Sequence, residues 1–490
     1  MSIDSKRFKS CLRIYWWVFA LSFSSFGVLG ADDFVAGPLF SQFALTLDSG
    51  HRSEAIGPFF FSQEKDSEKT WGISPLFSHD SDPAVESKES DLLYPLLTYE
   101  CFGAEYRWQF CQLLSFSGGK DQESALARRF TLFPIYFQQR SPDASENYTA
   151  LVPFYGHLKD RLFHDDIFFV MFPIYSETRK RDVVTDNYLY PFFHLRHGEG
   201  LHGWQFWPLA GNEHKDVTTR TNGFGEPEIV GGHDRSFALW PVHFRQNNGI
   251  GTDNPEKFRA SLPLYALSRS PKRDSTSVLW PFFIWTADRE KKYREWDSPW
   301  PFIVVARGEG KTTTRVWPLF GRAHSDVLES DFYLWPLYKF NRFHTELVDR
   351  RRTRILFYLF GNVTEKNIET GAQRHRMDLW PLFTYHRDFN GNNRLQILAP
   401  IEPVLPDNRG VERNWSPLWS LWRSEDNPKS GATCQSLLWN LYRRDSTPVS
   451  KKCSLLLGLF QYQLDSETNK LRLFYIPVLK WHKHGGQTVK

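Results

Sequence analysis

The sequence predicts an all-β protein built as one long antiparallel meander. Aromatic residues make up 16% of the 490 positions, with 42 Phe and 19 Trp against 3 Met, unlike the Leu- and Ala-rich balance of a helical protein. A short proline-containing phrase recurs along the whole chain, and a proline about every twenty residues would break helices. No stretch keeps apolar residues at positions i, i+3, i+4 and i+7 across three turns. With 41% hydrophobic residues, the chain can bury a large core, which excludes wholesale disorder.

The first thirty residues have the layout of a secretory signal peptide. Four basic residues between positions 6 and 13 precede an apolar stretch over 14–29, and Gly30 and Ala31 follow as small residues. This stretch is shorter than the roughly twenty apolar residues that span a bilayer, so we expect cleavage near Gly30 and not a retained anchor. Cys11 precedes the apolar region, so no lipid anchor is expected. The sequence therefore predicts an exported protein at the outer membrane or cell surface, with the periplasm or secretion as alternatives.

The charge gives no reason to expect a nucleic-acid partner. The formal net charge is +4, and the first thirty residues supply +3 of it, from four basic residues against Asp4. Residues 31–490 therefore carry about +1, which is too little to attract a polyanion.

The repeated phrase reads apolar-aromatic-Pro-apolar-aromatic. From Pro134 to Pro208, successive copies are spaced by 19, 20, 18 and 17 residues. In the copy at 276–285, Thr, Val, Trp and Phe surround Pro281, and polar turn residues follow, which is typical of one strand and one turn. Counting degenerate copies without proline, such as 356–360, the chain holds about 23 units, so we expect 22–24 strands. Clear copies centre on Pro95, Pro134, Pro191, Pro281, Pro336 and Pro381.

A longer repeat indicates a duplicated block with one insertion. Prolines 191, 208, 241 and 263 are spaced by 17, 33 and 22 residues, while Pro301, Pro318, Pro336 and Tyr358 are spaced by 17, 18 and 22. The two blocks match if the first has gained fifteen residues, because 33 exceeds 18 by that number. We therefore expect a single repetitive domain over 31–490 with a polar loop insertion at about 212–235.

The closure of the sheet is harder to predict. Export, the number of strands and abundant Trp and Tyr favour a large outer-membrane barrel. If Pro281 lies in mid-strand, however, Trp280 and Leu279 make both faces apolar, and the missing amide leaves a carbonyl unpaired. These two features suit stacked sheets, such as propeller blades. We expect a barrel, with propeller-like stacked sheets as the alternative. In both, Trp335 should pack within the sheet, and its replacement by Ala should cost about 3 to 5 kcal/mol.

Four cysteines remain after the predicted cleavage. Cys434 and Cys453 each open an apolar segment, so they would lie at opposite ends of a hairpin, too far apart for a disulfide. Cys101 and Cys111 flank one short predicted turn and fit a disulfide better. Neither pair has the spacing of a zinc or redox site.

One histidine cluster resembles a metal site. His194, His197 and His202 lie close to Glu199, in the spacing His-x-x-His followed by a third histidine. The corresponding turn after Pro301 keeps Gly-Glu-Gly but has no histidine, so the repeat accounts for this segment without a metal.

Other motifs fail on their spacing. Gly310-Lys311-Thr312 lacks the first glycine of a phosphate loop. The basic runs at 179–181 and 350–354 are expected to be solvated turns, with contact to anionic lipid or polysaccharide as the alternative. Asp165 and Asp166 would point to opposite faces of a strand, so they cannot form a hydrolase pair, and we expect a turn there.

The sequence thus offers no catalytic, cofactor-binding or metal-binding residue. We expect a non-catalytic exported cell-envelope protein, of the structural or pore-like outer-membrane barrel type. A soluble, secreted or periplasmic propeller-like protein that binds or processes glycans is the alternative. The expected partners are the membrane or an envelope polysaccharide.

Overall fold

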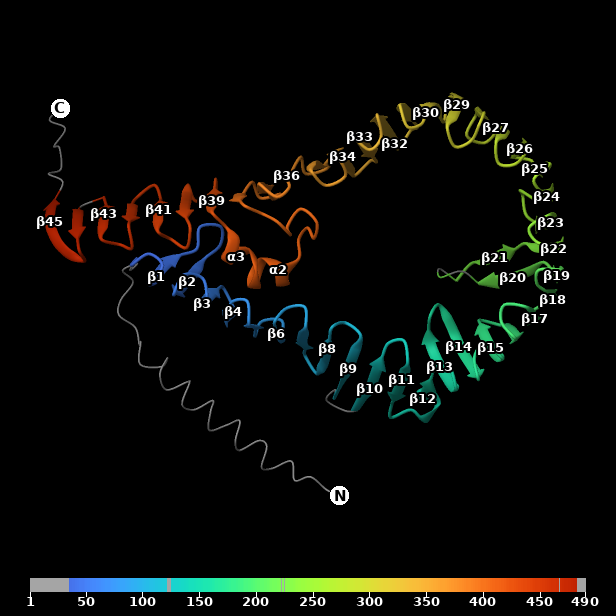
Figure 1. Ribbon diagram of the computed structural model, residues 1–490, viewed down its shortest axis with the longest axis horizontal. Coiled ribbons are helices and arrows are strands. Elements are labelled where there is room, and N and C mark those ends of the chain that lie inside the picture. The colour runs from blue at the N-terminus through green and yellow to red at the C-terminus, as the bar shows by residue number, and fades with distance from the viewer. Residues whose placement is uncertain (1–34, 121–124, 222, 224, 467, 483–490) are drawn as a thin grey trace, which may run out of the picture.

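The structure is a computed structural model that describes residues 35–120, 125–221, 223, 225–466 and 468–482. It is all-β, with 61% strand, 3% helix and 45 antiparallel strands. All strands except β20 and β21 form one sheet, in which each strand pairs with its neighbours along the chain (Figure 1). The predicted all-β meander is therefore confirmed. The predicted signal peptide, 1–30, lies outside the described residues.

The first third of the sheet consists of β1 (Phe40–Ala44), β2 (Gly50–Ala55), β3 (Phe60–Lys65), β4 (Glu68–Ile73), β5 (Phe77–Asp82), β6 (Ser87–Leu92), β7 (Leu97–Phe102), β8 (Glu105–Phe110), β9 (Leu114–Lys120), β10 (Ala125–Leu132), β11 (Tyr136–Arg140), β12 (Tyr148–Leu151), β13 (Tyr155–Arg161), β14 (His164–Val170) and β15 (Tyr175–Lys180). The middle third consists of β16 (Val183–Tyr188), β17 (Phe193–Gly198), β18 (Leu201–Phe206), β19 (Ala210–Lys215), β20 (Thr218–Thr221), β21 (Pro227–Val230), β22 (Gly232–Ala238), β23 (His243–Ile250), β24 (Glu256–Ser261), β25 (Tyr265–Arg269), β26 (Arg273–Val278), β27 (Phe283–Asp288), β28 (Tyr293–Asp297), β29 (Ile303–Gly308) and β30 (Thr312–Val316). The last third consists of β31 (Phe320–His324), β32 (Leu328–Tyr333), β33 (Tyr338–His344), β34 (Val348–Ile355), β35 (Phe360–Asn367), β36 (Gln373–Leu379), β37 (Phe383–Arg387), β38 (Asn393–Ile397), β39 (Trp422–Asn427), β40 (Ala432–Leu437), β41 (Tyr442–Ser446), β42 (Lys451–Leu455), β43 (Phe460–Leu464), β44 (Thr468–Leu473) and β45 (Ile476–His482).

Three short helices interrupt the described strands: η1 (Ala144–Glu146), α2 (Arg409–Asn414) and α3 (Ser416–Trp419). The side chain of Asn408 caps α2 by accepting a hydrogen bond from the Val411 amide at 2.9 Å. Among the described residues, no helix is both long and apolar enough to cross a membrane.

The repeating unit is a hairpin of two strands, so the prediction of one strand per unit and 22–24 strands in all is wrong. The strand β26 ends at Val278, residues 279–282 form a turn, and β27 begins at Phe283. The Phe282 amide closes the turn by donating to the Leu279 carbonyl at 2.9 Å, and Pro281 is the third residue of the turn. Sequence patterns favour a strand here because the turn itself is apolar, so the apolar run continues from one strand into the next.

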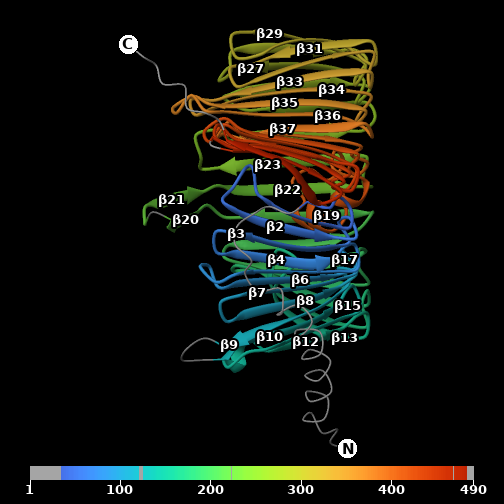
Figure 2. The same cartoon turned by 90° about the vertical axis from the view of Figure 1, so that its left-hand side faces the viewer.

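The sheet curves into a ring whose strands run along the shortest axis of the molecule (Figures 1 and 2). At its two ends, β1 pairs with β2 and β45 pairs with β44, and β1 and β45 are not paired with each other. The structure therefore shows no hydrogen-bonded closed barrel. The propeller-like alternative is wrong, because one continuous sheet replaces separate blades.

The ring closes where its two ends face each other. We call β1–β6 the N-terminal limb, β38–β43 the C-terminal limb, and the region between them the seam. Asn440 of the C-terminal limb donates to Glu54 of the N-terminal limb at 2.7 Å, and the guanidinium of Arg443 lies 3.3 Å from the centre of the Phe43 ring. The short helices α2 and α3 lie inside the ring beside the seam (Figure 1). Face-to-face packing thus takes the place of strand pairing.

Strand alternation divides the side chains between an inner and an outer face. The face that carries Glu54 and Asp91 on one limb and Arg423 on the other points into the ring, because these residues contact or face the opposite limb. Many inner-face residues near the proline turns are small or polar and buried, such as Ser78, Ser176 and Ser277. The best-packed apolar cluster joins Tyr148, Ala150, Leu158 and Phe169 on β12–β14. The inner face of the described residues is therefore mixed, with this apolar cluster on β12–β14 and polar or charged side chains at the seam.

Candidate functional site

The turns that contain the prolines form one edge of the ring, which we call the apolar rim. In the turn over 279–282, Leu279 is 50% exposed and Phe282 is 49% exposed. None of the rim turns contains Asp, Glu, Lys or Arg. The rim is defined by residues 93–96, 111–113, 133–135, 152–154, 171–174, 189–192, 207–209, 239–242, 262–264, 279–282, 298–302, 317–319, 334–337, 356–359, 380–382, 438–441 and 456–459. The apolar surface is therefore one edge that follows the sheet around the ring.

Backbone hydrogen bonds continue along this rim from turn to turn. The amide of Leu334 donates to the Leu319 carbonyl at 2.6 Å, and the amide of Trp335 donates to the Pro318 carbonyl at 2.7 Å. The amide of Leu337 closes its own turn by donating to Leu334 at 2.7 Å, and proline has no amide hydrogen. Every amide hydrogen of this turn is therefore satisfied inside the protein, as an apolar environment requires.

Aromatic side chains form a second apolar tier on the outer face, next to the turns. Tyr175, Tyr188, Phe193 and Phe206 are register partners on four successive strands. Their neighbouring ring centres are 5.3, 5.8 and 6.4 Å apart. Trp207 and Trp240 lie 5.6 Å apart in the same way within the turns. The aromatic rings thus contact one another from hairpin to hairpin.

On β15 and β16, charged residues begin one row further from the rim. Glu177 pairs in register with Asp186 on the outer face, two residues beyond Tyr175 and Tyr188. The Tyr175 hydroxyl donates to Asp186 at 3.2 Å, and burial together with this hydrogen bond raises the pKa of Tyr175 to about 12. At this hairpin the apolar zone comprises the turns and one strand row, about 10 Å in depth at 3.4 Å per residue. On β7–β9 it is at least one row deeper, because Tyr99, Trp108 and Phe116 are register partners in the second row of the outer face.

The opposite edge of the ring is polar. Its turns carry ion pairs between neighbouring hairpins, such as Lys272 with Glu290 and Lys292 with Glu309, each at 2.7 Å. Scattered apolar residues also occur here, including Phe163 and Leu347. The ring is thus amphipathic along its axis, with one apolar edge and one charged edge.

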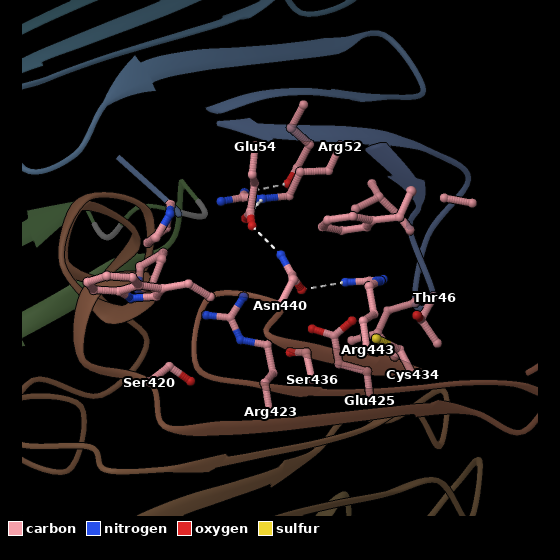
Figure 3. Close-up of a pocket in the computed structure, with 18 of the residues that line it drawn as sticks. Thr46, Arg52, Glu54, Ser420, Arg423, Glu425, Cys434, Ser436, Asn440 and Arg443 are labelled. Atoms are coloured by element: carbon pink, nitrogen blue, oxygen red, sulfur yellow. Dashed lines mark hydrogen bonds and ion pairs between the residues drawn. The ribbon is translucent and has the colours of Figure 1, made fainter. Parts of the chain in front are cut away.

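A cavity of about 180 Å³ lies in the seam (Figure 3). Arg52 and Glu54 of β2 line it from the N-terminal limb, and Arg423 and Glu425 of β39 line it from the C-terminal limb. Nothing in the sequence signals this site, because its two halves lie more than 330 residues apart in the chain.

The histidines of the candidate metal site are split between the two faces. His197 and His202 are register partners on the outer face, while His194 pairs with Gln205 on the inner face and Glu199 lies in the turn. No group of three metal-ligating residues is found in the described part of the chain. The arrangement does not bring the three histidines together.

Two expected turns are strands, so these predictions are wrong. Asp165 and Asp166 lie within β14 and point to opposite faces, and Asp166 faces Arg179. The basic run at 350–354 lies within β34, where Arg350, Arg352 and Arg354 share the inner face. Burial and these two neighbouring cations lower the pKa of Arg352. Charged residues form strands here because the inner face is polar, whereas the sequence interpretation assumed an apolar sheet.

The insertion at about 212–235 is shorter than expected. Residues 212–215 belong to β19 and residues 232–235 to β22, which pair with each other in the main sheet. The true insertion includes the separate hairpin of β20 and β21, which projects beyond the polar edge (Figure 2). Neither this hairpin nor its flanks line the seam cavity.

The remaining expectations concern cysteines and Trp335. Cys101, Cys111, Cys434 and Cys453 are free thiols, so the Cys101–Cys111 pair, whose bridging the sequence leaves open, is not bridged. Cys101 pairs with Tyr106 on β8, whereas Cys111 follows the far end of that strand.

Trp335 is 40% exposed on the apolar rim, and its expected place in the packed sheet is wrong because the proline phrase is a turn.

Comparisons with known proteins do not assign this chain to a family. No model of a protein family matches the chain, and a search of curated proteins finds no significant match.

Proposed function

We propose that this chain is a non-catalytic, exported cell-envelope protein that rests on a membrane by its apolar rim. The ring would stand edge-on, with the proline turns inserted among the lipid chains and the charged edge in water. The observation that carries this proposal is the apolar rim itself, a row of exposed, charge-free turns.

The extent of the rim supports a membrane partner. Soluble monomers rarely expose a contiguous apolar patch of more than a few hundred Å². Here exposed Leu, Trp and Phe side chains recur in turn after turn, as in Trp280, Leu319 and Leu334. The amide hydrogens of the 334–337 turn are all used within the protein, so such a turn can enter hydrocarbon without an unpaired donor.

The order of residue types along the strands supports a shallow position. From the edge inward, aliphatic and Trp turns are followed by Tyr and Phe, and then by charged residues such as Asp186. Tyr and Trp are enriched where a membrane meets water. This sequence of types matches the passage from acyl chains through the interface to water.

The depth of the apolar zone favours insertion into one leaflet over a spanning barrel. Membrane-spanning strands need about 9 to 11 residues, and their outer face is apolar over about 25 Å. The strands here have four to eight residues, and on β15 and β16 the outer face carries charges beyond the first row. We propose that the ring is barrel-like in shape but attached from one side, closed by its seam instead of by hydrogen bonds.

Vesicle co-sedimentation of the processed full chain tests this function. The variant Leu279→Asp/Leu319→Asp/Leu334→Asp places three charges on the apolar rim. We expect wild-type protein to pellet with phosphatidylcholine–phosphatidylglycerol vesicles and this variant to lose at least about tenfold in vesicle affinity, because each buried Leu side chain contributes about 1.5 to 3 kcal/mol.

The matched control carries the same number of charges on the opposite edge. Phe163, Val327 and Leu347 are exposed apolar residues in its turns, and the variant Phe163→Asp/Val327→Asp/Leu347→Asp should bind vesicles like the wild type. Equal loss in both variants, or wild-type protein that stays in the supernatant, would overturn the proposal.

A further inference from the structure

The seam cavity has a charged side and an apolar side. Figure 3 shows Arg423 and Ser436 rising from the C-terminal limb toward Arg52 and Glu54 on the other limb. Phe43 and Trp439 contribute apolar surface to the same cavity. A ligand that fits this site would therefore combine a polar group with an apolar body.

The ion pairs around the cavity leave one cation without a partner. Three of the four lining arginines have a carboxylate partner: Arg52 pairs with Glu54 at 2.7 Å, Arg394 with Glu425 at 3.6 Å and Arg443 with Asp445 at 2.8 Å. The third lining carboxylate, Asp48, pairs with Lys65 at 3.1 Å. Among the described residues, no carboxylate lies within 4.0 Å of Arg423. Arg394 also pairs with Glu412 at 3.3 Å, and the nearest negative charges to Arg423 are those of Glu425 and Glu54. Arg423 is thus the one lining arginine without a carboxylate in direct contact.

Four hydrogen-bond donors on residues that line the cavity also lack a hydrogen-bond partner among the described residues. They are the Nε of Arg423, the Nε of Arg394, the Nη2 of Arg52 and the hydroxyl of Ser420, all of them atoms shielded from solvent. Ser420 itself is only 8% exposed. A buried donor without an acceptor costs about 1 to 3 kcal/mol, so an acceptor supplied by a ligand would be favourable. These donors come from both limbs and line one cavity.

We propose that the seam cavity binds a small organic monocarboxylate. The guanidinium of Arg423 has no carboxylate in direct contact and can pair with one negative group, and a carboxylate offers two acceptor oxygens to a guanidinium. A phosphate dianion fits less well, because Glu54 and Glu425 also face the cavity. A cavity of about 150 Å³ accommodates benzene, so the 180 Å³ here suits a molecule of the size of benzoate. Because both limbs supply donors, the bound carboxylate would hold the seam closed.

The experiment uses the full processed chain, with benzoate as the probe and benzamide as its neutral isostere. We expect benzoate to bind in calorimetry and to raise the melting temperature, and benzamide to do neither. Arg423→Met should weaken benzoate binding by at least about tenfold, because a charge-assisted hydrogen bond is lost. Arg444→Met is the matched control, since Arg444 is an exposed residue of β41 on the outer face, and it should bind benzoate like the wild type.

A second variant protects the test against misfolding of Arg423→Met. Ser420→Ala keeps the charge and removes one unpartnered hydroxyl, and it should weaken benzoate binding by about fivefold. Equal binding of benzoate and benzamide, unchanged binding in both cavity variants, or binding of phenyl phosphate without benzoate would each overturn the proposal.

Discussion

At the scale of single residues, the first position of many rim turns is unusual. Leu93, Leu189, Leu279 and Leu334 have φ angles of 47°, 49°, 46° and 45°. An L-residue other than Gly, Asn or Asp pays about 1 to 2 kcal/mol in this left-handed region. The chain nevertheless repeats Leu there, half exposed to solvent, so apolar character at the rim outweighs the local backbone preference.

Replacing one such leucine separates stability from membrane contact. Leu279→Asn should raise the free energy of unfolding by about 1 kcal/mol, because Asn tolerates the left-handed region and little buried surface is lost. The same variant should bind vesicles more weakly than the wild type. Denaturant unfolding and co-sedimentation measure the two effects. A clear loss of stability would show that Leu279 is needed for packing and not for an external partner.

At the scale of elements, the sequence predicts strands and repeats correctly but misplaces the turns. Composition and the spacing of the prolines predict an antiparallel meander and an insertion within the first of the two duplicated blocks. Turn prediction relies on polar residues, and the turn over 279–282 has none, so half of the strands were missed. The charge-free turns of the rim are visible in the sequence, but they indicate a contact surface only once their exposure is known.

The strand β28 carries a carboxylate that makes stability depend on pH. Asp297 is 6% exposed, and burial, followed by the nearby charge of Glu295, raises its pKa from 3.8 to about 6. The protonated form is therefore favoured in the folded state. Its stabilising contribution is complete below about pH 4 and is lost as the pH rises through about 6.

Asp297→Asn should remove this dependence. At pH 7.5 the variant should be more stable than the wild type by about 1 to 2 kcal/mol, and at pH 4 the two should be equally stable. Urea unfolding at both pH values measures the difference. Glu295→Gln should shift the wild-type transition to lower pH, because a negative neighbour is removed. A difference that is the same at both pH values would contradict this assignment.

At the scale of the whole molecule, the seam is the feature that no local pattern predicts. Arg413 of α2 donates to Glu89 at 2.7 Å and contacts Asp91, across more than 320 residues of chain. Asp91 is 1% exposed, and its carboxylate also accepts a hydrogen bond from Asn414 at 2.9 Å. Such contacts follow from the curvature of the entire sheet, which a repeat of about twenty residues does not encode.

Arg413→Met should therefore open the ring at the seam. Removal of one partner from a buried ion pair costs about 3 to 5 kcal/mol of folding stability. The ion pair lost here is one of the contacts that join the two limbs. We expect faster hydrogen exchange in β1–β6 and β39–β43, a larger radius of gyration in solution scattering, and unchanged exchange in β22–β33. The second change Asp91→Asn should partly restore closure. Uniformly faster exchange would instead indicate that the limbs and the far side unfold together.

The mode of closure also bears on how such a ring can change in size. A hydrogen-bonded barrel needs a fixed strand number and stagger for its edges to meet. A ring that closes by packing two faces needs no fixed strand number or stagger. A whole hairpin can therefore be gained or lost without disturbing the seam. The related blocks that begin at Pro191 and Pro301 are consistent with growth by this route. Circumference is then a property that duplication of short segments can adjust, while the contacts that shut the ring stay constant.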